Sequence, residues 1–314
     1  MKFIKIIPIS IGSLALSLAA LGNLLLPSFG ETARFICGIT SAIIILLFAL
    51  KLIFDSSNVK EELKSPVPLS VLPNATMTLM LLATYIHPYL AVPAIFSWYF
   101  AALAHIGIML IFFRRFVVNL KIANVFPSWF VAFVGITTVS ITAPIIGAEQ
   151  IGQAVFYIAF VLYFIALPLV LYRMIKSGKP IPEPLKPTIV IFTAPMSLLV
   201  VGYLSSFGEW QENLLYFMLI MAFASYLYVT FMMITSLLKI KFCPTYTAFT
   251  FPFVISAIAF ERGAEFLSER GAFFMSPIAH ISKWMAVAIV LYVIVRYVIF
   301  FWQSIMTTDT SSLY

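Results

Sequence analysis

Ten long apolar stretches divide the chain, and short polar links separate them. The stretches cover residues 3–27, 33–54, 67–87, 91–113, 125–147, 151–175, 185–207, 211–238, 244–266 and 278–304. A helix needs about 20 apolar residues to cross the hydrocarbon core of a bilayer. The stretches are continuously apolar and do not alternate with polar positions, which argues against a β-barrel. The pattern predicts an all-α integral membrane protein with ten transmembrane helices in one domain over residues 1–314.

The composition strengthens this prediction and excludes other classes of protein. Hydrophobic residues make up 62% of the chain and charged residues 10%, against roughly 45–50% and 25% in soluble proteins. Lipid must cover so much apolar surface, so we expect membrane lipids as partners and no nucleic acid. The net charge of +7 suits anionic lipid headgroups. The sequence has no phosphate-binding glycine loop, metal-ligand cluster or nucleophile with a nearby base, so we expect no catalytic residues, metal or cofactor.

The distribution of Lys and Arg predicts the orientation in the membrane. Most of them lie in loops on one side, and only Arg34, Arg262, Arg270 and Lys283 lie in loops on the other. Cytoplasmic loops carry the excess of positive charge, so both termini are predicted to be cytoplasmic, in the cell inner (plasma) membrane. The opposite rim is net acidic and does not obviously attract anions. Near it, Glu261, Arg262 and Glu265 have the spacing of a locally paired or a solvated helix end.

Prolines form an internal repeat. Pro8, Pro68, Pro127, Pro187 and Pro244 lie 57 to 60 residues apart. Each opens an odd-numbered stretch, where the first helical turn tolerates proline because its N–H groups have no intrahelical partner. The spacing predicts five helical hairpins. The alternative is that prolines merely begin helices and happen to recur.

Helix-weakening residues also recur within the odd stretches. We predict kinks at Gly12, Pro73, Gly135, Pro195 and Pro252. A proline inside a helix leaves a carbonyl without its intrahelical bond, and lipid cannot satisfy that carbonyl. Kinked helices therefore belong inside the protein or along a water-filled path. The prediction is that bent odd helices line a central pore and straighter even helices surround them.

Small hydroxyl side chains are the candidate lining of such a pore. We single out five of them on the odd stretches: Thr76, Thr137, Thr193, Ser197 and Ser256. Hydroxyls can replace part of an ion's hydration shell, although hydrogen bonds between helices are the alternative role. No Asp or Glu lies in mid-membrane, which argues against proton or sodium coupling. His105 is a possible substrate contact, with satisfied packing as the alternative.

Several short motifs resemble one known family. Thr250–Phe253 reads Thr-Phe-Pro-Phe, Ser65–Val67 reads Ser-Pro-Val, Pro127–Phe130 reads Pro-Ser-Trp-Phe, and Ala194 precedes Pro195. In order and spacing they resemble the tellurite-resistance/dicarboxylate transporter family, which includes bacterial tellurite-resistance proteins and plant slow-type anion channels. The resemblance runs over nearly the whole chain.

The resemblance implies a function and a gate. Family members are homotrimers with a pore in each protomer, occluded by an aromatic residue of the ninth helix, and the motif position gives Phe253 here. We therefore expect an anion channel-like transport protein for small anions. The alternative is a secondary carrier that exports C4-dicarboxylates, sulfite or toxic oxyanions such as tellurite. A membrane scaffold without transport is the third hypothesis.

Overall fold

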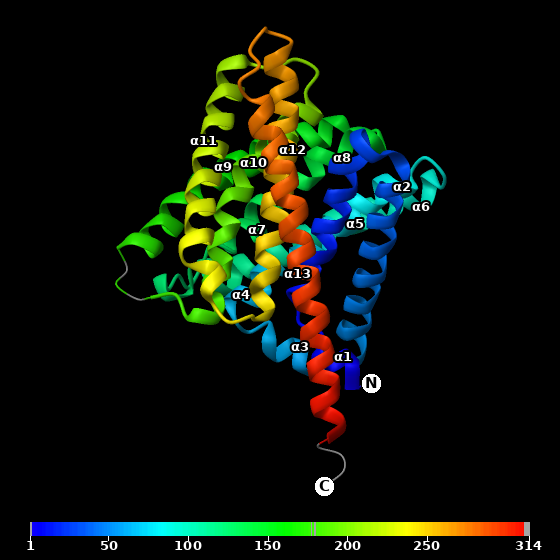
Figure 1. Cartoon of the computed structure of the whole chain (residues 1–314), viewed down its shortest axis with the longest axis vertical. Coiled ribbons are helices and arrows are strands. Elements are labelled where there is room, and N and C mark those ends of the chain that lie inside the picture. The colour runs from blue at the N-terminus through cyan, green and yellow to red at the C-terminus, as the bar shows by residue number, and fades with distance from the viewer. Residues whose placement is uncertain (1, 177, 179, 311–314) are drawn as a thin grey trace.

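The computed structural model describes residues 2–176, 178 and 180–310, and this part of the chain forms helices and loops with no strand. Figure 1 shows α13 (Ser276–Thr310) running along the long axis, with its C-terminal end and α1 (Lys2–Ile6) at the same end of the molecule. The other long helices are α2 (Ile11–Phe54), α6 (Ala91–Phe112), α9 (Glu149–Ile175) and α11 (Glu212–Thr235). Most of the described residues are thus helical, as the apolar stretches predict.

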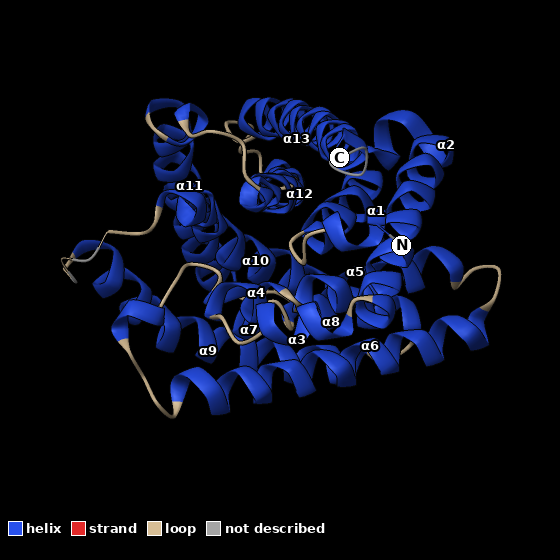
Figure 2. Ribbon diagram, turned by 90° about the horizontal axis from the view of Figure 1, so that it is seen from below, coloured by secondary structure: helices blue, strands red, loops and turns tan. Residues whose placement is uncertain are grey.

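Shorter pieces make up the middle of the protein. They are α4 (Pro66–Val71), α5 (Pro73–Ile86), α7 (Trp129–Val134), α8 (Thr137–Ile146), η3 (Glu183–Thr193), α10 (Ala194–Ser206), η5 (Pro244–Phe249) and α12 (Thr250–Ser268). The connecting pieces are α3 (Ser56–Glu62), η1 (Phe113–Val117), η2 (Ile122–Asn124) and η4 (Leu237–Lys239). Viewed along the long axis, the middle pieces lie centrally, and α6, α9, α11 and α13 lie around them (Figure 2).

Burial separates the two groups of helices. In the most apolar parts of 66–86, 129–146 and 183–206, 72 to 89% of the residues are buried. In the corresponding parts of α6 with η1, α9, α11 with η4, and α13, the buried share is only 22 to 39%. Apolar side chains cover the exposed faces of these outer helices, among them Phe96, Ile158, Phe231 and Val298. We call the two groups the interior and the surrounding helices.

The first half of α2 and the pair η5 and α12 are also mostly buried, and with the three segments above they make five interior segments. Each of the five is interrupted close to a helix-breaking residue. The chain turns between α1 and α2 at Pro8, between α4 and α5 just before Pro73, and between α7 and α8 at Gly135. Two further segments begin as 3₁₀-helix: η3 changes to α10 just before Pro195, and η5 changes to α12 just before Pro252. Proline cannot donate to the turn before it, so a new α-helix starts there.

Counted by length and hydropathy alone, the helices that could cross a membrane are fewer than the ten predicted. Eight helices among the described residues are long and apolar enough to cross a membrane. One is the 44-residue helix α2, which would be about 66 Å long if straight, against a hydrocarbon core of about 30 Å. It is interrupted at Gly30, which has φ 69° and ψ −170°. α12 is not among the eight. The count of ten stays a prediction.

Candidate functional site

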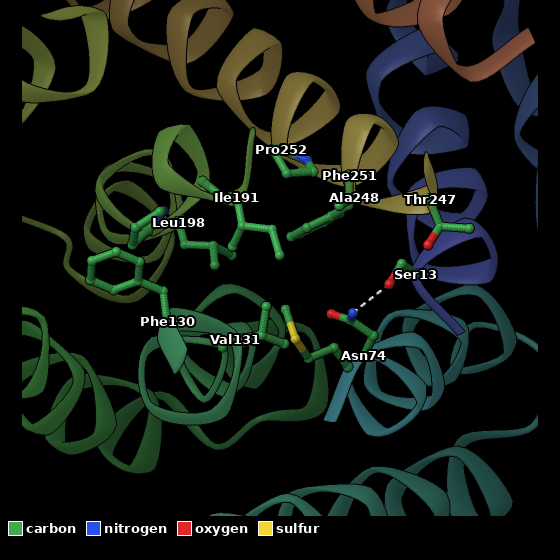
Figure 3. Close-up of a pocket in the computed structure, with 14 residues that line it drawn as sticks. Ser13, Asn74, Phe130, Val131, Ile191, Leu198, Thr247, Ala248, Phe251 and Pro252 are labelled. Atoms are coloured by element: carbon green, nitrogen blue, oxygen red, sulfur yellow. Dashed lines mark hydrogen bonds between the residues drawn. The ribbon is translucent and has the colours of Figure 1, made fainter. Parts of the chain in front are cut away.

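All five interior segments meet at a small cavity in the middle of the protein, which we call the narrow cavity. Its volume is about 20 Å³, which is space for roughly one water molecule. Figure 3 shows the side chains that line it. They come from α2, α5, α7, η3 with α10, and η5 with α12: Ser13, Asn74, Met77, Phe130, Val131, Gly135, Ile191, Ala194, Pro195, Leu198, Thr247, Ala248, Phe251 and Pro252.

The polar groups of the narrow cavity lie on one side of it. Ser13, Asn74 and Thr247 are the polar lining residues, and no lining residue is ionisable. The Asn74 amide Nδ2 donates to Ser13 Oγ over 2.6 Å (Figure 3). The opposite wall is apolar, with Phe130 and Leu198. A permeating group would therefore meet hydrogen-bonding atoms without meeting a fixed charge.

A second cavity, the wide cavity, follows along the same segments toward their C-terminal ends. Its volume is about 470 Å³. It is lined by α2, α5, α8, α10 and α12 through Ala20, Asn23, Leu24, Pro27, Leu81, Thr138, Ile141, Pro144, Ile145, Leu198, Val201, Ser205, Phe251, Ile255, Ile258, Glu261, Arg262 and Glu265. Because Glu265 is exposed, this cavity reaches the surface of the protein.

Phe251 and Leu198 line both cavities and so lie where the two adjoin. Phe251 lies on α12 directly before Pro252, and Leu198 lies on α10. Both side chains are buried, with Phe251 6% exposed. A phenyl ring and an isobutyl group thus lie at the junction of a wide, charged space and a narrow, uncharged one.

The residue predicted as the gate, Phe253, lies elsewhere on the same helix. It is completely buried, lines neither cavity, and packs edge-on against Tyr226 of α11 with ring centroids 5.4 Å apart. Successive residues of an α-helix are rotated by about 100°, so Phe251 and Phe253 point to nearly opposite sides. Phe253 as the gate stays a prediction, and the cavity geometry favours Phe251 for that role. In the sequence, the position of Phe251 directly before Pro252 in the Thr-Phe-Pro-Phe motif is the feature that could have indicated this role.

Three of the five predicted kinks lie at the narrow cavity. Gly135, Pro195 and Pro252 line it, while Gly12 and Pro73 line neither cavity. Gly12 lies in the first turn of α2, where an added Cβ would be 3.5 Å from the backbone nitrogen of Ala75. Pro73 is the first residue of α5.

The hydroxyls predicted to line a pore are buried among the interior helices and line neither cavity. Thr193, Ser197 and Ser256 form a hydrogen-bonded group between α10 and α12, with Oγ–Oγ distances of 3.0 and 3.2 Å from Ser256. Thr137 donates to the carbonyl of Val134, and Thr76 to that of Pro73. The bonds from Ser256 join two interior segments, as the alternative role expects, whereas the bonds of Thr137 and Thr76 to backbone carbonyls lie within their own segments. A role of the five hydroxyls in lining a pore stays a prediction. The hydroxyls at the cavities belong to Ser13, Thr138, Ser205 and Thr247.

His105 also lies behind the cavities. It is fully buried on α6, and its Nδ1 is 3.0 Å from Thr76 Oγ1. It lines neither cavity, so its role in substrate contact stays a prediction without geometric support. No group of His, Cys, Asp and Glu within the described residues could hold a metal ion.

A further cavity of about 530 Å³ lies away from the interior path, between α9, η3 and α11. Apolar side chains such as Ile175 and Met232 line most of it. Ile175 is largely exposed, so this cavity opens on the apolar outer surface, where lipid chains would fill it.

Surrounding helices with apolar outer faces that enclose interrupted interior helices define the architecture of an integral membrane protein. The chain belongs to the voltage-dependent anion channel family, whose sequence pattern matches residues 6–298. No curated protein matches the chain. The family membership confirms the resemblance found in the sequence motifs, and places the protein among anion channels and transporters.

Proposed function

We propose that this protein is a channel for small anions, with one pathway in each protomer. The path runs through the wide cavity, past Phe251 and Leu198, and through the narrow cavity. The observation that carries the proposal is that two cavities built by the same five segments adjoin at only two shared side chains, which we take as the partition between them. A lining without a fixed negative charge in the narrow part tolerates anions.

The proposal includes ten membrane crossings in five hairpins. Buried residues of α2 gather between Ile11 and Leu24, and exposed apolar ones follow Gly30, such as Ile36 and Ile43. The first half of α2 thus resembles an interior helix and the second half a surrounding one. These two halves, with η5 and α12 as one further crossing, bring the eight to ten. We further propose a homotrimer in the plasma membrane, with cytoplasmic termini and with the wide cavity facing outward.

We assign the gate to Phe251. Its ring is apolar and fills the boundary between the cavities, so a hydrated ion cannot pass until the ring moves. Hydrophobic constrictions of this kind gate by excluding water. The narrow cavity behind it has space for about one water molecule, so an ion that enters it must lose part of its hydration shell.

Anion flux into proteoliposomes tests the channel and its gate together. Wild type is compared with Phe251→Ala, for chloride and nitrate against potassium. Phe253→Ala is the matched control, since it removes the same ring two residues away. We expect at least about a ten-fold rise in anion flux in Phe251→Ala only, because removal of the ring opens the constriction. A rise confined to Phe253→Ala would return the gate to Phe253.

The same vesicles test the carrier alternative. Labelled C4-dicarboxylate and sulfite are supplied on one side, with unlabelled anion on the other. Saturable exchange without conductance in any variant would replace the channel with a carrier. Absence of both activities in folded protein would leave only a membrane scaffold.

A further inference from the structure

Three charged residues of α12 line the wide cavity: Glu261, Arg262 and Glu265. Their partners differ. Glu261 Oε1 is 3.0 Å from Lys283 Nζ, and Lys283 also donates to Ser28 Oγ over 2.7 Å. The acidic charge of Glu261 is therefore balanced by a buried lysine on α13. Glu265 is exposed and forms no ion pair among the described residues.

Arg262 is held only by neutral groups. Its Nη1 donates to Ser205 Oγ over 2.6 Å and its Nη2 to the carbonyl of Leu204 over 3.2 Å, both on α10. No carboxylate of the described residues forms an ion pair with it, although Glu261 and Glu265 are its neighbours on the helix. Two neutral acceptors fix the guanidinium in place beside the wide cavity. Glu265 attracts it electrostatically without forming an ion pair, so the guanidinium keeps N–H groups that an anion could bind.

The other arginine near this cavity is different. Arg34 Nε donates to Asn23 Oδ1, and its Nη1 is 3.3 Å from Glu31 Oε1. Its charge is shared with a carboxylate, and Arg34 itself does not line the cavity. Among the described lining residues, Arg262 is therefore the cation that an anion in the wide cavity would meet.

We propose that Arg262 and Ser205 form a binding site for a small monovalent anion, such as chloride or nitrate, in the wide cavity. Ser205 Oγ accepts the bond from Arg262 and forms no other hydrogen bond among the described residues, so its proton can donate to the anion. Hydrogen bonds from a guanidinium to an anion are roughly twice as strong as neutral ones. Exposed charges act over about a Debye length, roughly 8–10 Å at 0.1–0.15 M salt. Within that distance the Arg262 guanidinium offsets the repulsion that the acidic rim exerts on an anion.

In the proposed channel, this site would select anions over cations. Only this selectivity role rests on the proposed function, because anion binding itself does not require conduction. An anion bound at Arg262 is already inside the wide cavity and needs only to pass Phe251. A cation in the same place meets the guanidinium charge. The Glu261–Lys283 pair supports the site, because without Lys283 the carboxylate next to Arg262 would be unbalanced.

Chloride binding to the purified protein in neutral detergent tests the site without flux. The readout is the width of the ³⁵Cl nuclear magnetic resonance line, with nitrate as the competitor. We expect Arg262→Gln to weaken chloride binding at least about three-fold, as loss of one partly exposed charge would. Arg270→Gln is the matched control. Arg270 pairs with Glu212 at 2.8 Å and does not line the cavity, so its removal should leave binding unchanged.

A second variant protects the test against misfolding of the first. Lys283→Gln keeps Arg262 and leaves Glu261 unbalanced, so chloride binding should weaken in the same direction. Unchanged binding in folded Arg262→Gln, or in Lys283→Gln if the first does not fold, would overturn the site.

Flux separates this inference from the proposed function. In Phe251→Ala vesicles, Arg262→Gln should raise the chloride concentration for half-maximal flux by at least about three-fold. Flux that does not depend on Arg262 would overturn the site and leave the channel. Chloride binding at Arg262 in a protein that never conducts would overturn the channel and leave the site.

Discussion

The narrow and the wide cavity are built by the same five segments but differ in size and in charge. One measures about 20 Å³ and has no ionisable lining residue, and the other measures about 470 Å³ and has three. The narrow cavity lies where the segments are interrupted, beside Gly135, Pro195 and Pro252. The wide cavity lies along the regular helices that follow. The interior segments thus lie closest together where they are interrupted and leave space there for about one water molecule. Farther along the same segments they diverge and leave the larger space.

The strongest test of the partition uses cysteine probes on its two sides. We expect Ile258→Cys in the wide cavity to react with an external sulfonate-bearing thiol reagent at all times. Val131→Cys in the narrow cavity should react at least about ten-fold faster once Phe251 is alanine, because the ring no longer blocks the reagent. Both probes are placed in a chain without Cys37 and Cys243, and labelling is followed by mass spectrometry. Equal rates for Val131→Cys with and without Phe251 would place the partition elsewhere.

A methyl group added at Gly135 tests how tightly the narrow cavity is packed. An added Cβ would collide with the carbonyl oxygen of Val131 and would be 2.9 Å from Met77 Sδ. We expect Gly135→Ala to lower the free energy of unfolding in detergent by about 1–3 kcal/mol.

Gly107 on α6 provides the matched control for that prediction. An added Cβ there meets nothing within 4 Å, so Gly107→Ala should stabilise the helix by up to about 1 kcal/mol. If both glycines tolerate alanine equally, the interior is looser than the contacts at Gly135 require.

The polar side of the narrow cavity should affect chloride conductance less than the gate does, but by a measurable amount. Asn74→Leu keeps the approximate volume and leaves Ser13 without its amide partner. In the open Phe251→Ala protein we expect the conductance for chloride to fall several-fold, since an unmet hydrogen bond costs about 1–3 kcal/mol. Ser70→Ala is the control, because Ser70 donates to Ser128 over 2.7 Å between interior helices away from both cavities. An equal loss of conductance in both variants would assign the effect to packing.

The smallest expected effect concerns the exposed end of the wide cavity. Glu265→Gln should raise chloride flux by less than about two-fold at low salt, because exposed charges act weakly through water. The rise should vanish near 1 M salt, where the Debye length is about 3 Å. A rise that persists at high salt would indicate a direct contact of Glu265 with the permeating anion.

The proline repeat predicted where interior segments lie because proline is favoured in the first turn of a helix and disfavoured later. Pro244 is the first residue of η5 and Pro68 lies in the first turn of α4, while Pro187 lies inside η3. Proline alone does not mark an interior segment, since Pro168 lies inside the surrounding helix α9. The five hairpins stay a prediction. The crossing through α2 is harder to predict. Gly30 adopts a backbone conformation that is essentially restricted to glycine, yet the helix assignment continues through it.

Residue roles within an interior helix could not be predicted in this way. Thr193 and Ser256 are on the expected helices but face each other, since a buried hydroxyl satisfies its hydrogen bond wherever a partner lies. Phe251 and Phe253 are two positions apart, and the ring of Phe253 packs against Tyr226 of α11 while that of Phe251 lines the cavities. Pairwise packing of this kind leaves no trace in composition or periodicity.

The wide cavity also has an electrical consequence for an ion on the proposed path. A space of about 470 Å³ that opens to the surface, once filled with water, stays close to the potential of the solution beside it. The transmembrane voltage must then fall mainly across Phe251, Leu198 and the narrow cavity. The work on one elementary charge, about 2.3 kcal/mol per 100 mV, is thus concentrated over a small part of the membrane thickness, at the side chain that closes the path.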